Sequence, residues 1–195
     1  MPSGCQPTSS IATGEPMITL LSRSEFAPLF SQFRHRAWMF ETGEHYSWAY
    51  EADELARFAE GSPTRPPDVA WWRPWLDQIR ELSGQGKEIG RVRVVTEPPT
   101  VYQRWERWAL PWHIEAGEQI AYMSRNQASE VGLPDYDFWL FDDDTLVLLT
   151  YRADGTQSGK ILISHEDAPA LVAQHCVWRN LAIRQATLAG EAAPA

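Results

Sequence analysis

Seven charged or phenolic side chains gather in one short stretch near the middle of the sequence. They are Arg91, Arg93, Glu97, Tyr102, Arg104, Glu106 and Arg107. The stretch runs from a β-branched segment that is typical of a strand, across a Pro-Pro break, into the first turns of an expected helix. Guanidinium groups bind carboxylates and phosphates through paired hydrogen bonds, and a helix N-terminus also favours an anion. The pattern therefore favours a pocket for a small anionic ligand, in which Arg93 and Arg104 donate hydrogen bonds beside Glu97 and Tyr102.

The same residue types allow two other interpretations of this stretch. The more ordinary one is structural: Arg93 pairs with Glu97 or Glu106 and so holds the strand against the helix. The other is catalytic, with Glu97, Glu106 or His113 as the groups that transfer protons. His113 also has a plain structural interpretation, because a single His beside a Trp is more often packed in a loop than catalytic.

The sequence lacks the residue spacings that are typical of known catalytic and metal-binding motifs. Gly86-Lys87 and Gly159-Lys160 lack the Ser or Thr that completes a phosphate loop, and neither G-x-G-x-x-G nor G-x-S-x-G occurs. The five His and two Cys have no metal-ligand spacing, and the Asp run at 142–144 is typical of a hairpin turn. We therefore expect neither a metal nor another cofactor. A Ser–His–Asp arrangement stays open, because its members need not be neighbours in sequence.

The charge balance argues against direct contact with nucleic acid. The 195 residues include 17 Lys and Arg against 26 Asp and Glu, which gives a formal net charge of −9. Proteins that grip a phosphate backbone rely on clustered Lys and Arg. An acidic chain of this kind is better suited to bind a basic protein partner that itself contacts DNA.

Length and hydropathy predict one cytoplasmic domain. We expect a flexible leader over 1–16, a single globular domain over 17–189 and a frayed tail over 190–195. The leader has no Lys or Arg and no long apolar run, so it does not resemble a signal peptide. No apolar run approaches the roughly 20 residues that span a bilayer, so we expect no membrane contact.

Local patterns predict an α/β or α+β fold with helices packed on one mixed β-sheet. Expected helices lie at 22–33, 52–59, 75–82, from 100, from 124 and at 167–188, and expected strands lie at 35–42, 89–95, 119–123, 136–141, 146–151 and 160–163. Capping boxes at Ser22 to Glu25 and Thr100 to Gln103 mark two of the helix starts. In 89–95, β-branched residues alternate with Arg91 and Arg93, which predicts one buried face and one partly polar face.

Aromatic residues are unusually frequent, with ten Trp in the chain. Trp71 and Trp72 lie in a Pro-flanked segment, so we expect them to be exposed anchors for a protein partner. Trp105 belongs to a helical stripe that is better explained by core packing. We also expect Phe33, Trp139 and Phe141 in the core.

Two segments resemble a family of small actinobacterial proteins of unknown function, abundant in Streptomyces and often encoded beside WhiJ-type helix-turn-helix regulators. They are RVRVVTEPPTVYQRWERWALPWHIEAGEQIAYM, from Arg91, and LPDYDFWLFDDDTLVLL, from Leu133. The most specific pieces are 91–95 with Glu97-Pro98, 115–118 and 137–142, and the resemblance covers roughly residues 20–188. It implies a regulatory context and carries no activity.

A second likeness is to the phospholipase-D-like domains that serve as sensors in some bacterial transcription regulators. It rests on the order of strand, helix, short strand, D-F-W-L-F-D-D hairpin, further strand and covering helix, and it implies a half-domain architecture of that kind. Catalytic members need a His-x-Lys pair, with His as nucleophile and Lys as phosphate ligand. The residues two positions after each His here are Ala37, Ser47, Glu115, Asp167 and Val177. The resemblance therefore implies binding without phosphodiester chemistry.

Three functions from different classes follow from these observations. The leading one is a non-catalytic module that senses a small ligand or acts as the regulatory partner of a helix-turn-helix transcription regulator. The alternative is a small enzyme of specialised metabolism that uses the same Arg/Glu/Tyr pocket. The third is a purely structural interaction protein without a ligand.

Overall fold

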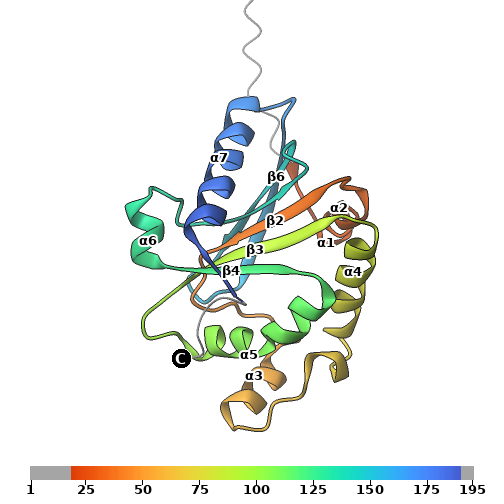
Figure 1. The fold of residues 1–195 in the computed structure, drawn as a ribbon, viewed down its shortest axis with the longest axis vertical. Helices are drawn as coiled ribbons and strands as arrows, with labels where there is room; N and C mark the ends of the chain where they lie inside the picture. Colours follow the sequence, from red (N-terminus) through yellow and green to blue (C-terminus); the bar gives the residue numbers. More distant parts are fainter. Residues whose placement is uncertain (1–18, 190–195) are drawn as a thin grey trace, which may run out of the picture.

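Within residues 19–189, which the computed structural model describes, eight strands form one mixed sheet (Figure 1). The strands are β1 (Thr19–Leu20), β2 (Arg36–Glu41), β3 (Glu88–Val95), β4 (Gln119–Ser124), β5 (Asp137–Phe141), β6 (Thr145–Tyr151), β7 (Gln157–Ser164) and β8 (Thr187–Leu188). Their order across the sheet is β1-β7-β6-β5-β2-β3-β4-β8. β2, β3 and β4 are parallel to one another, and the other pairings are antiparallel. The predicted fold class, helices on a single mixed sheet, is confirmed.

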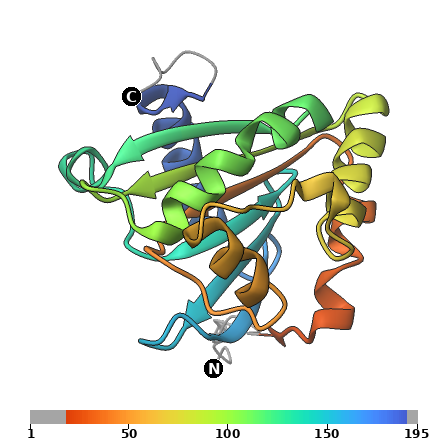
Figure 2. The ribbon, with the colours of Figure 1, turned by 90° about the horizontal axis from the view of Figure 1, so that it is seen from below.

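Helices cover both faces of this sheet (Figures 1 and 2). They are α1 (Arg23–Phe26), α2 (Leu29–Gln32), α3 (Ala52–Ala59), the 3-10 helix η1 (Pro66–Asp68), α4 (Arg73–Gly84), α5 (Val101–Ala116), α6 (Arg125–Glu130) and α7 (Pro169–Gln185). Figure 2 shows α7 on one face and α3, α4 and α5 on the other. No helix in the described part of the chain is both long and apolar enough to cross a membrane.

Alternation along the strands divides the apolar residues between two cores. On β2, Ala37 and Met39 pack with residues of α4 and α5, whereas Trp38 and Phe40 pack with residues of α7. Successive strand side chains point to opposite faces, so β2, β3, β5, β6 and β7 each contribute to both cores. Phe33, Trp105, Trp139 and Phe141 all lie in the core on the α4–α5 side, as predicted.

Two predicted helices have different ends in the structure. Residues 22–33 form two short helices because Pro28, which cannot donate a backbone hydrogen bond, interrupts them. The helix predicted over 167–188 ends at Gln185, and β8 then pairs with β4. Both predicted capping boxes are present, and the one at Thr100 fixes the start of α5. The predicted leader (1–16) and tail (190–195) lie outside the described residues.

Candidate functional site

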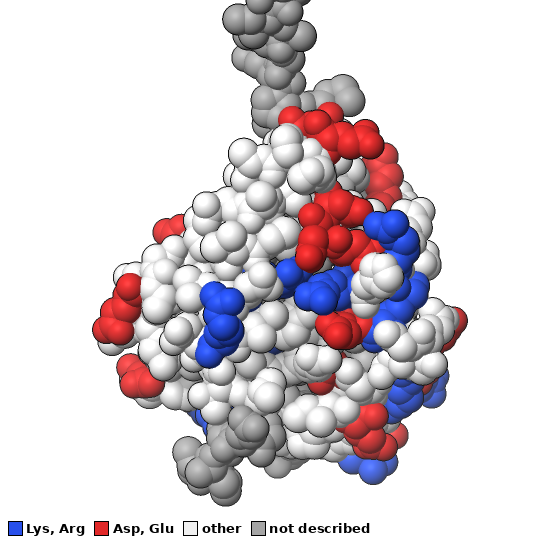
Figure 3. Space-filling view, turned by 45° about the horizontal axis from the view of Figure 1, so that its top comes forward, with Lys and Arg blue, Asp and Glu red and all other residues white. Residues whose placement is uncertain are grey.

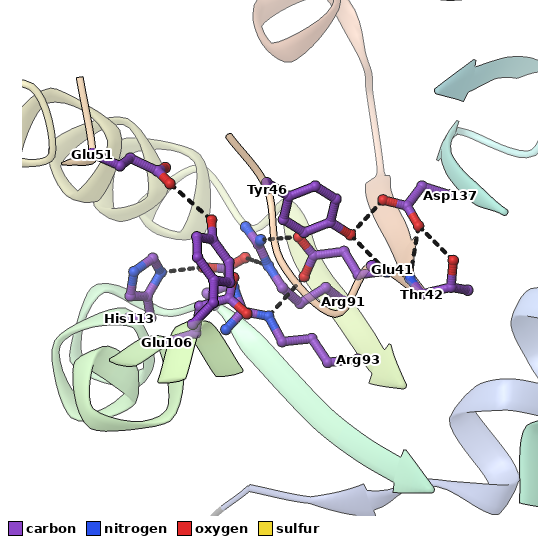
Figure 4. A network of polar contacts seen from close by, with 12 residues as sticks. Glu41, Thr42, Tyr46, Glu51, Arg91, Arg93, Glu106, His113 and Asp137 are labelled. Carbon is purple, nitrogen blue, oxygen red and sulfur yellow. Dashed lines mark hydrogen bonds and ion pairs between the residues drawn. The ribbon is translucent and has the colours of Figure 1, made fainter. Parts of the chain in front are cut away.

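A buried cluster of charged side chains lies between α5 and the carboxyl ends of β2 and β3 (Figure 4). Glu41 ends β2, and Arg91 and Arg93 stand at alternate positions of β3 on the same face of the sheet. All three are less than a tenth exposed. In open α/β sheets, ligands bind outside the carboxyl ends of the strands, which makes this edge the place to look for a site.

Each of the two arginines pairs with two carboxylates. Glu41 accepts from both: Arg91 Nη1 lies 3.2 Å from its Oε1, and Arg93 Nε lies 2.7 Å from its Oε2. Arg91 Nε also donates to Glu118 Oε1 at 2.6 Å, and Arg93 Nη2 lies 2.9 Å from Glu106 Oε1. The predicted partly polar face of β3 is present, but it is buried as well, because α5 covers these guanidiniums and carboxylates pair with them.

His113 extends this cluster toward the core. Trp72 Nε1 donates to His113 Nε2 at 2.9 Å, and His113 Nδ1 lies 2.6 Å from Glu118 Oε2. The indole can only donate, so Nε2 accepts and the proton of the neutral imidazole is on Nδ1. Both ring nitrogens are thus occupied. His113 lies in the last turns of α5 rather than in a loop.

A second set of buried hydrogen bonds joins the end of β2 to the start of β5. Tyr46 donates its hydroxyl to Asp137 Oδ2 at 2.5 Å, and the backbone N–H and hydroxyl of Thr42 donate to Oδ1 at 2.7 and 2.9 Å. Burial raises the pKa of Asp137 to about 6, although these hydrogen bonds act in the opposite direction. The arrangement holds the chain where it leaves β2 (Figure 4).

Carboxyl groups outnumber guanidinium groups in the cluster, and their pKa values diverge. Burial raises the pKa of Glu106 to about 8 despite the nearby Arg93. Burial also raises the pKa of Glu51 to about 7; this carboxylate accepts from the Tyr102 hydroxyl at 2.8 Å. Against the effect of burial, Arg91 lowers the pKa of Glu118 to about 2. Glu106 therefore keeps a proton to a higher pH than an ordinary carboxyl group, whereas Glu118 stays charged to a lower pH.

A small pocket opens within this cluster at the ends of the parallel strands. Its lining consists of Glu41, Gly43, Tyr46, Arg93, Val94, Val95, Gln103, Glu106 and Tyr122. The volume open to the centre of a water molecule is about 10 Å³, roughly what one ordered water needs. The Tyr122 hydroxyl is buried and has no hydrogen-bond partner among residues 19–189. A buried hydroxyl without a partner is unfavourable, so it marks a place for a missing polar group.

The structure brings together only some of the predicted site residues. Arg93 and Glu106 line the pocket, and Tyr102 is buried next to them. Arg104 is exposed and donates to the Pro99 carbonyl at 3.0 Å. Two helix positions correspond to a rotation of about 200°, so Arg104 points away from the face that carries Tyr102. The predicted pairing of Arg93 with Arg104 as joint donors is therefore wrong.

The structure likewise confirms only some of the other predicted site and interface residues. Glu97 is exposed. Of the two partners that the structural interpretation allowed for Arg93, Glu106 is the one observed, so the predicted ion pair between β3 and α5 is confirmed. Trp72 is buried and bonded to His113, so its prediction as an exposed anchor is wrong. Its indole N–H finds a partner inside the core, as buried Trp side chains usually do. Trp71 is partly buried and stacks on Trp72, with ring centroids 4.9 Å apart.

Sequence reasoning missed several members of the cluster, above all Glu41 and Glu118. Glu41 has a signal in retrospect, since it continues the alternate positions of Ala37 and Met39. That signal becomes useful only with the knowledge that β2 lies beside β3. Among the described residues, no group of three or more His, Cys, Asp or Glu side chains is arranged to hold a metal ion.

Comparisons with known proteins give a family and distant structural similarities. A family model described as a domain of unknown function, DUF6879, matches residues 24–191. No curated protein matches the sequence. Among solved structures, a phosphatidylserine synthase from Haemophilus influenzae Rd KW20 is similar with a TM-score of 0.41 and 10% sequence identity over 84% of this chain. The chain spans 36% of that protein's length.

Proposed function

The chain belongs to the DUF6879 family, and we propose that it is a non-catalytic regulatory module that senses a small ligand and works with a helix-turn-helix transcription regulator. The observation that carries the sensing role is the pocket at the ends of β2, β3 and β4, where the Tyr122 hydroxyl has no hydrogen-bond partner within the described part of the chain. The charged groups around it are already paired with one another. Because these groups are paired, the site is suited to form a hydrogen bond with a ligand rather than to react with it.

The regulatory half of the proposal rests on sequence. The resemblance to actinobacterial proteins encoded beside WhiJ-type regulators suggests the partner, and the net charge of −9 suits a basic one. The partner would make the DNA contacts. We place the proposed contact surface at Trp71 and the neighbouring Tyr50, whose rings lie 5.0 Å apart and of which Tyr50 is 44% exposed.

The sensing role is tested with a variant that removes one oxygen atom. Metabolite fractions from the organism that encodes the protein are screened for an increase in its melting temperature. Tyr122→Phe is expected to lose the response to an active fraction, whereas Tyr50→Phe, which changes an exposed phenol, is expected to keep it. An active fraction that stabilises Tyr122→Phe as well as wild type would place the ligand elsewhere, and no active fraction would remove the sensing role.

The regulatory role is tested by co-purification. Tagged protein is isolated from its host, and the recovered proteins are identified by mass spectrometry. We expect a helix-turn-helix regulator in stoichiometric amount, recovered less well with Tyr50→Ala, and released by the active metabolite fraction. Recovery without any such regulator would overturn the regulatory half and favour a structural interaction protein or an independent ligand-binding protein.

One observation favours a second function, a small enzyme. Glu106 and Glu41 line the same pocket, and Glu106 is held protonated while the arginines keep Glu41 charged, against the effect of burial on its pKa. Pairs of carboxyls whose pKa values are pushed apart are typical of acid–base catalysis. Incubation with the host's metabolite extract distinguishes the two functions. A compound consumed by wild type in many turnovers, and left intact by Glu106→Gln, would establish the enzyme.

A further inference from the structure

We infer that the surface around α3 binds arginine side chains of the protein partner; the inference names the chemistry of that partner and rests on the proposed regulatory function. α3 stands at the lower end of the molecule, outside α5 (Figures 1 and 2). Its inward side, continued from the N-cap residue Glu51, carries Glu54, Leu55 and Phe58, which are only partly buried. No residue of α3 is fully buried. Because an apolar helix side is normally covered, part of this surface stays open to a partner.

Aromatic rings form the part of this surface next to the start of α3. Tyr50 is 44% exposed, and its neighbours Trp48 and Trp71 are partly buried. The Trp48 ring lies 5.9 Å from that of Tyr50 with an angle of 24° between the planes, and the Trp71 ring lies 5.0 Å from it at 60°. Guanidinium groups stack on such ring faces, which an ammonium cannot do as a planar group. The three rings therefore favour Arg over Lys.

The charge around these rings is complementary to a basic partner. Residues 42–64 contain five carboxylates and a single Lys or Arg, which is Arg57. In the described part of the chain, the ion pairs of this segment are Glu54 with Arg57 at 4.0 Å and Glu44 with Arg125 at 3.7 Å. Both are longer than the pairs of the buried cluster, which measure 2.6–3.2 Å. The excess of negative charge is therefore left for a partner to neutralise.

Two carboxylates beside the rings have oxygen atoms without donors. Glu54 Oε2 is buried and has no hydrogen-bond partner among residues 19–189. Glu51 accepts from the Tyr102 hydroxyl through Oε2 at 2.8 Å, and its Oε1 forms no hydrogen bond within the same residues. A buried acceptor without a donor is unfavourable, and a guanidinium brings five N–H donors. An arginine is thus suited both to the rings and to the carboxylates.

The nearby guanidinium groups of this chain do not reverse the preference for a cation. Burial raises the pKa of Tyr50 to about 12, and the charge of Glu51 adds to the rise by more than Arg23 opposes it. The side chain of Arg57 is 59% exposed, so solvent screens its charge. An anion at the rings would therefore add to a negative potential, whereas an arginine would reduce it.

The test measures the binding of fluorescently labelled peptides to wild-type protein by fluorescence anisotropy, at a constant ionic strength of about 0.15 M. The probes are short peptides of equal length in which Ala alternates with Arg, with Lys or with Glu. We expect saturable binding of the Arg peptide, binding of the Lys peptide that is weaker by about threefold to tenfold, and none of the Glu peptide.

Matched variants assign the binding to this surface. Tyr50→Ala is expected to weaken binding of the Arg peptide by about threefold to tenfold, because it removes the exposed ring. Tyr136→Ala is its control, since Tyr136 is 36% exposed and contacts α7 on the opposite face of the sheet. Glu51→Gln is expected to weaken binding to a similar extent, with the exposed Glu130→Gln of α6 as its control. Both controls are expected to bind like wild type.

Each contrary result has a distinct meaning. Equal binding of the Arg and Lys peptides, Arg binding that survives both Tyr50→Ala and Glu51→Gln, or no saturable Arg binding would overturn the inference. If Glu51→Gln does not fold, Tyr50→Ala decides alone. A helix-turn-helix regulator recovered by co-purification would in these cases leave the proposed function intact. Conversely, Arg binding as expected without any recovered regulator would keep this surface and overturn the proposed partner.

Discussion

Two groups of ion pairs lie at opposite ends of β2 and β3, in very different surroundings. Just before β2 begins, Arg34 pairs with two aspartates of the β5–β6 turn, and its side chain is 68% exposed. At the carboxyl ends, Arg91 pairs with Glu41 and Glu118, and its side chain is 9% exposed. On the surface drawn in Figure 3, acidic and basic side chains likewise lie next to one another in water. The same chemical pairing therefore occurs in this protein with and without solvent.

The difference teaches what each group can do. Exposed pairs contribute about 0–1 kcal/mol, because water screens them, whereas removing one partner of a buried pair costs about 3–5 kcal/mol. Burial also moves pKa values, as in Glu106, and it leaves the Tyr122 hydroxyl without a hydrogen-bond partner among residues 19–189. The proposed ligand site therefore lies at the carboxyl ends of the strands, whereas the ion pairs at the amino ends are exposed to water.

The largest predicted effect comes from removing the charge of Arg91. Arg91→Met keeps the apolar stem but removes the donor to one oxygen of each buried carboxylate, Glu118 Oε1 and Glu41 Oε1. The free energy of unfolding is expected to fall by about 3–5 kcal/mol. Urea denaturation followed by circular dichroism measures this change. A loss of unfolding free energy below about 1 kcal/mol would mean that the buried ion pairs contribute no more than the exposed ones, which would contradict the comparison.

The pH dependence of stability is the next largest effect. The pKa of Glu106 is about 8 in the folded protein against an ordinary value of 4.5, so the folded state retains a proton that the unfolded state releases. Its contribution is full below about pH 4.5 and is lost as the pH rises to about 8. Between pH 5 and pH 7 the expected decrease in the free energy of unfolding is about 2–3 kcal/mol, at about 1.4 kcal/mol per pH unit. Glu51 has the same sign, with a pKa of about 7.

Glu106→Gln is the variant that isolates this effect. A neutral amide does not titrate, so the decrease in stability between pH 5 and 8 should become shallower. Glu118 gives the opposite sign: its pKa of about 2 means that its contribution is present above about pH 4.5 and is lost as the pH falls toward 2. Thermal unfolding measured from pH 3 to 9 is therefore expected to show a maximum near pH 5. An unchanged slope in Glu106→Gln would show that other groups carry the dependence.

At the amino end of β2, substitution of Asp142 is expected to lower stability by an intermediate amount. Its side chain is only 6% exposed and accepts backbone hydrogen bonds from Arg34 at 2.5 Å, His35 at 2.7 Å and Arg36 at 3.1 Å. Asp142→Asn tolerates the positive φ of 49° but turns an amide donor toward a backbone N–H. We expect a loss of about 1–3 kcal/mol in urea denaturation. Asp144→Asn, at a 48% exposed side chain, is the control and is expected to stay near wild type.

Much of the fold could be predicted from the sequence because its signals are local. Capping boxes, Gly and Pro breaks and strand alternation each depend on a few adjacent residues, and they located most of the helices and strands. The predicted helix over 52–59 agrees with α3 in both bounds. The wrong prediction of one continuous helix across Pro28 also has a local cause, because a proline inside an apolar helical pattern already predicts a break.

The candidate site was less predictable because its contacts join residues that are far apart in the sequence. Arg91 meets Glu41 across 50 positions, a contact that depends on β2 and β3 being neighbours. Propensity and spacing do not supply strand order, so the sequence located the arginines but not their main partner. The prediction that Trp72 is exposed was wrong for a similar reason, since its partner His113 is 41 positions away. The orientation of Arg104 was accessible from helix geometry alone.

Arg34→Met is expected to have the smallest effect, and it sharpens the comparison through its response to salt. The same chemical change as in Arg91→Met removes a guanidinium that is 68% exposed, so the loss in unfolding free energy should be about 0–1 kcal/mol. At an ionic strength near 1 M the Debye length falls to about 3 Å, and the difference between Arg34→Met and wild type should vanish. Burial shields the pairs of Arg91 from such screening, so the deficit of Arg91→Met should persist in the same salt. Equal salt sensitivity of the two variants would show that water reaches both ends of the strands.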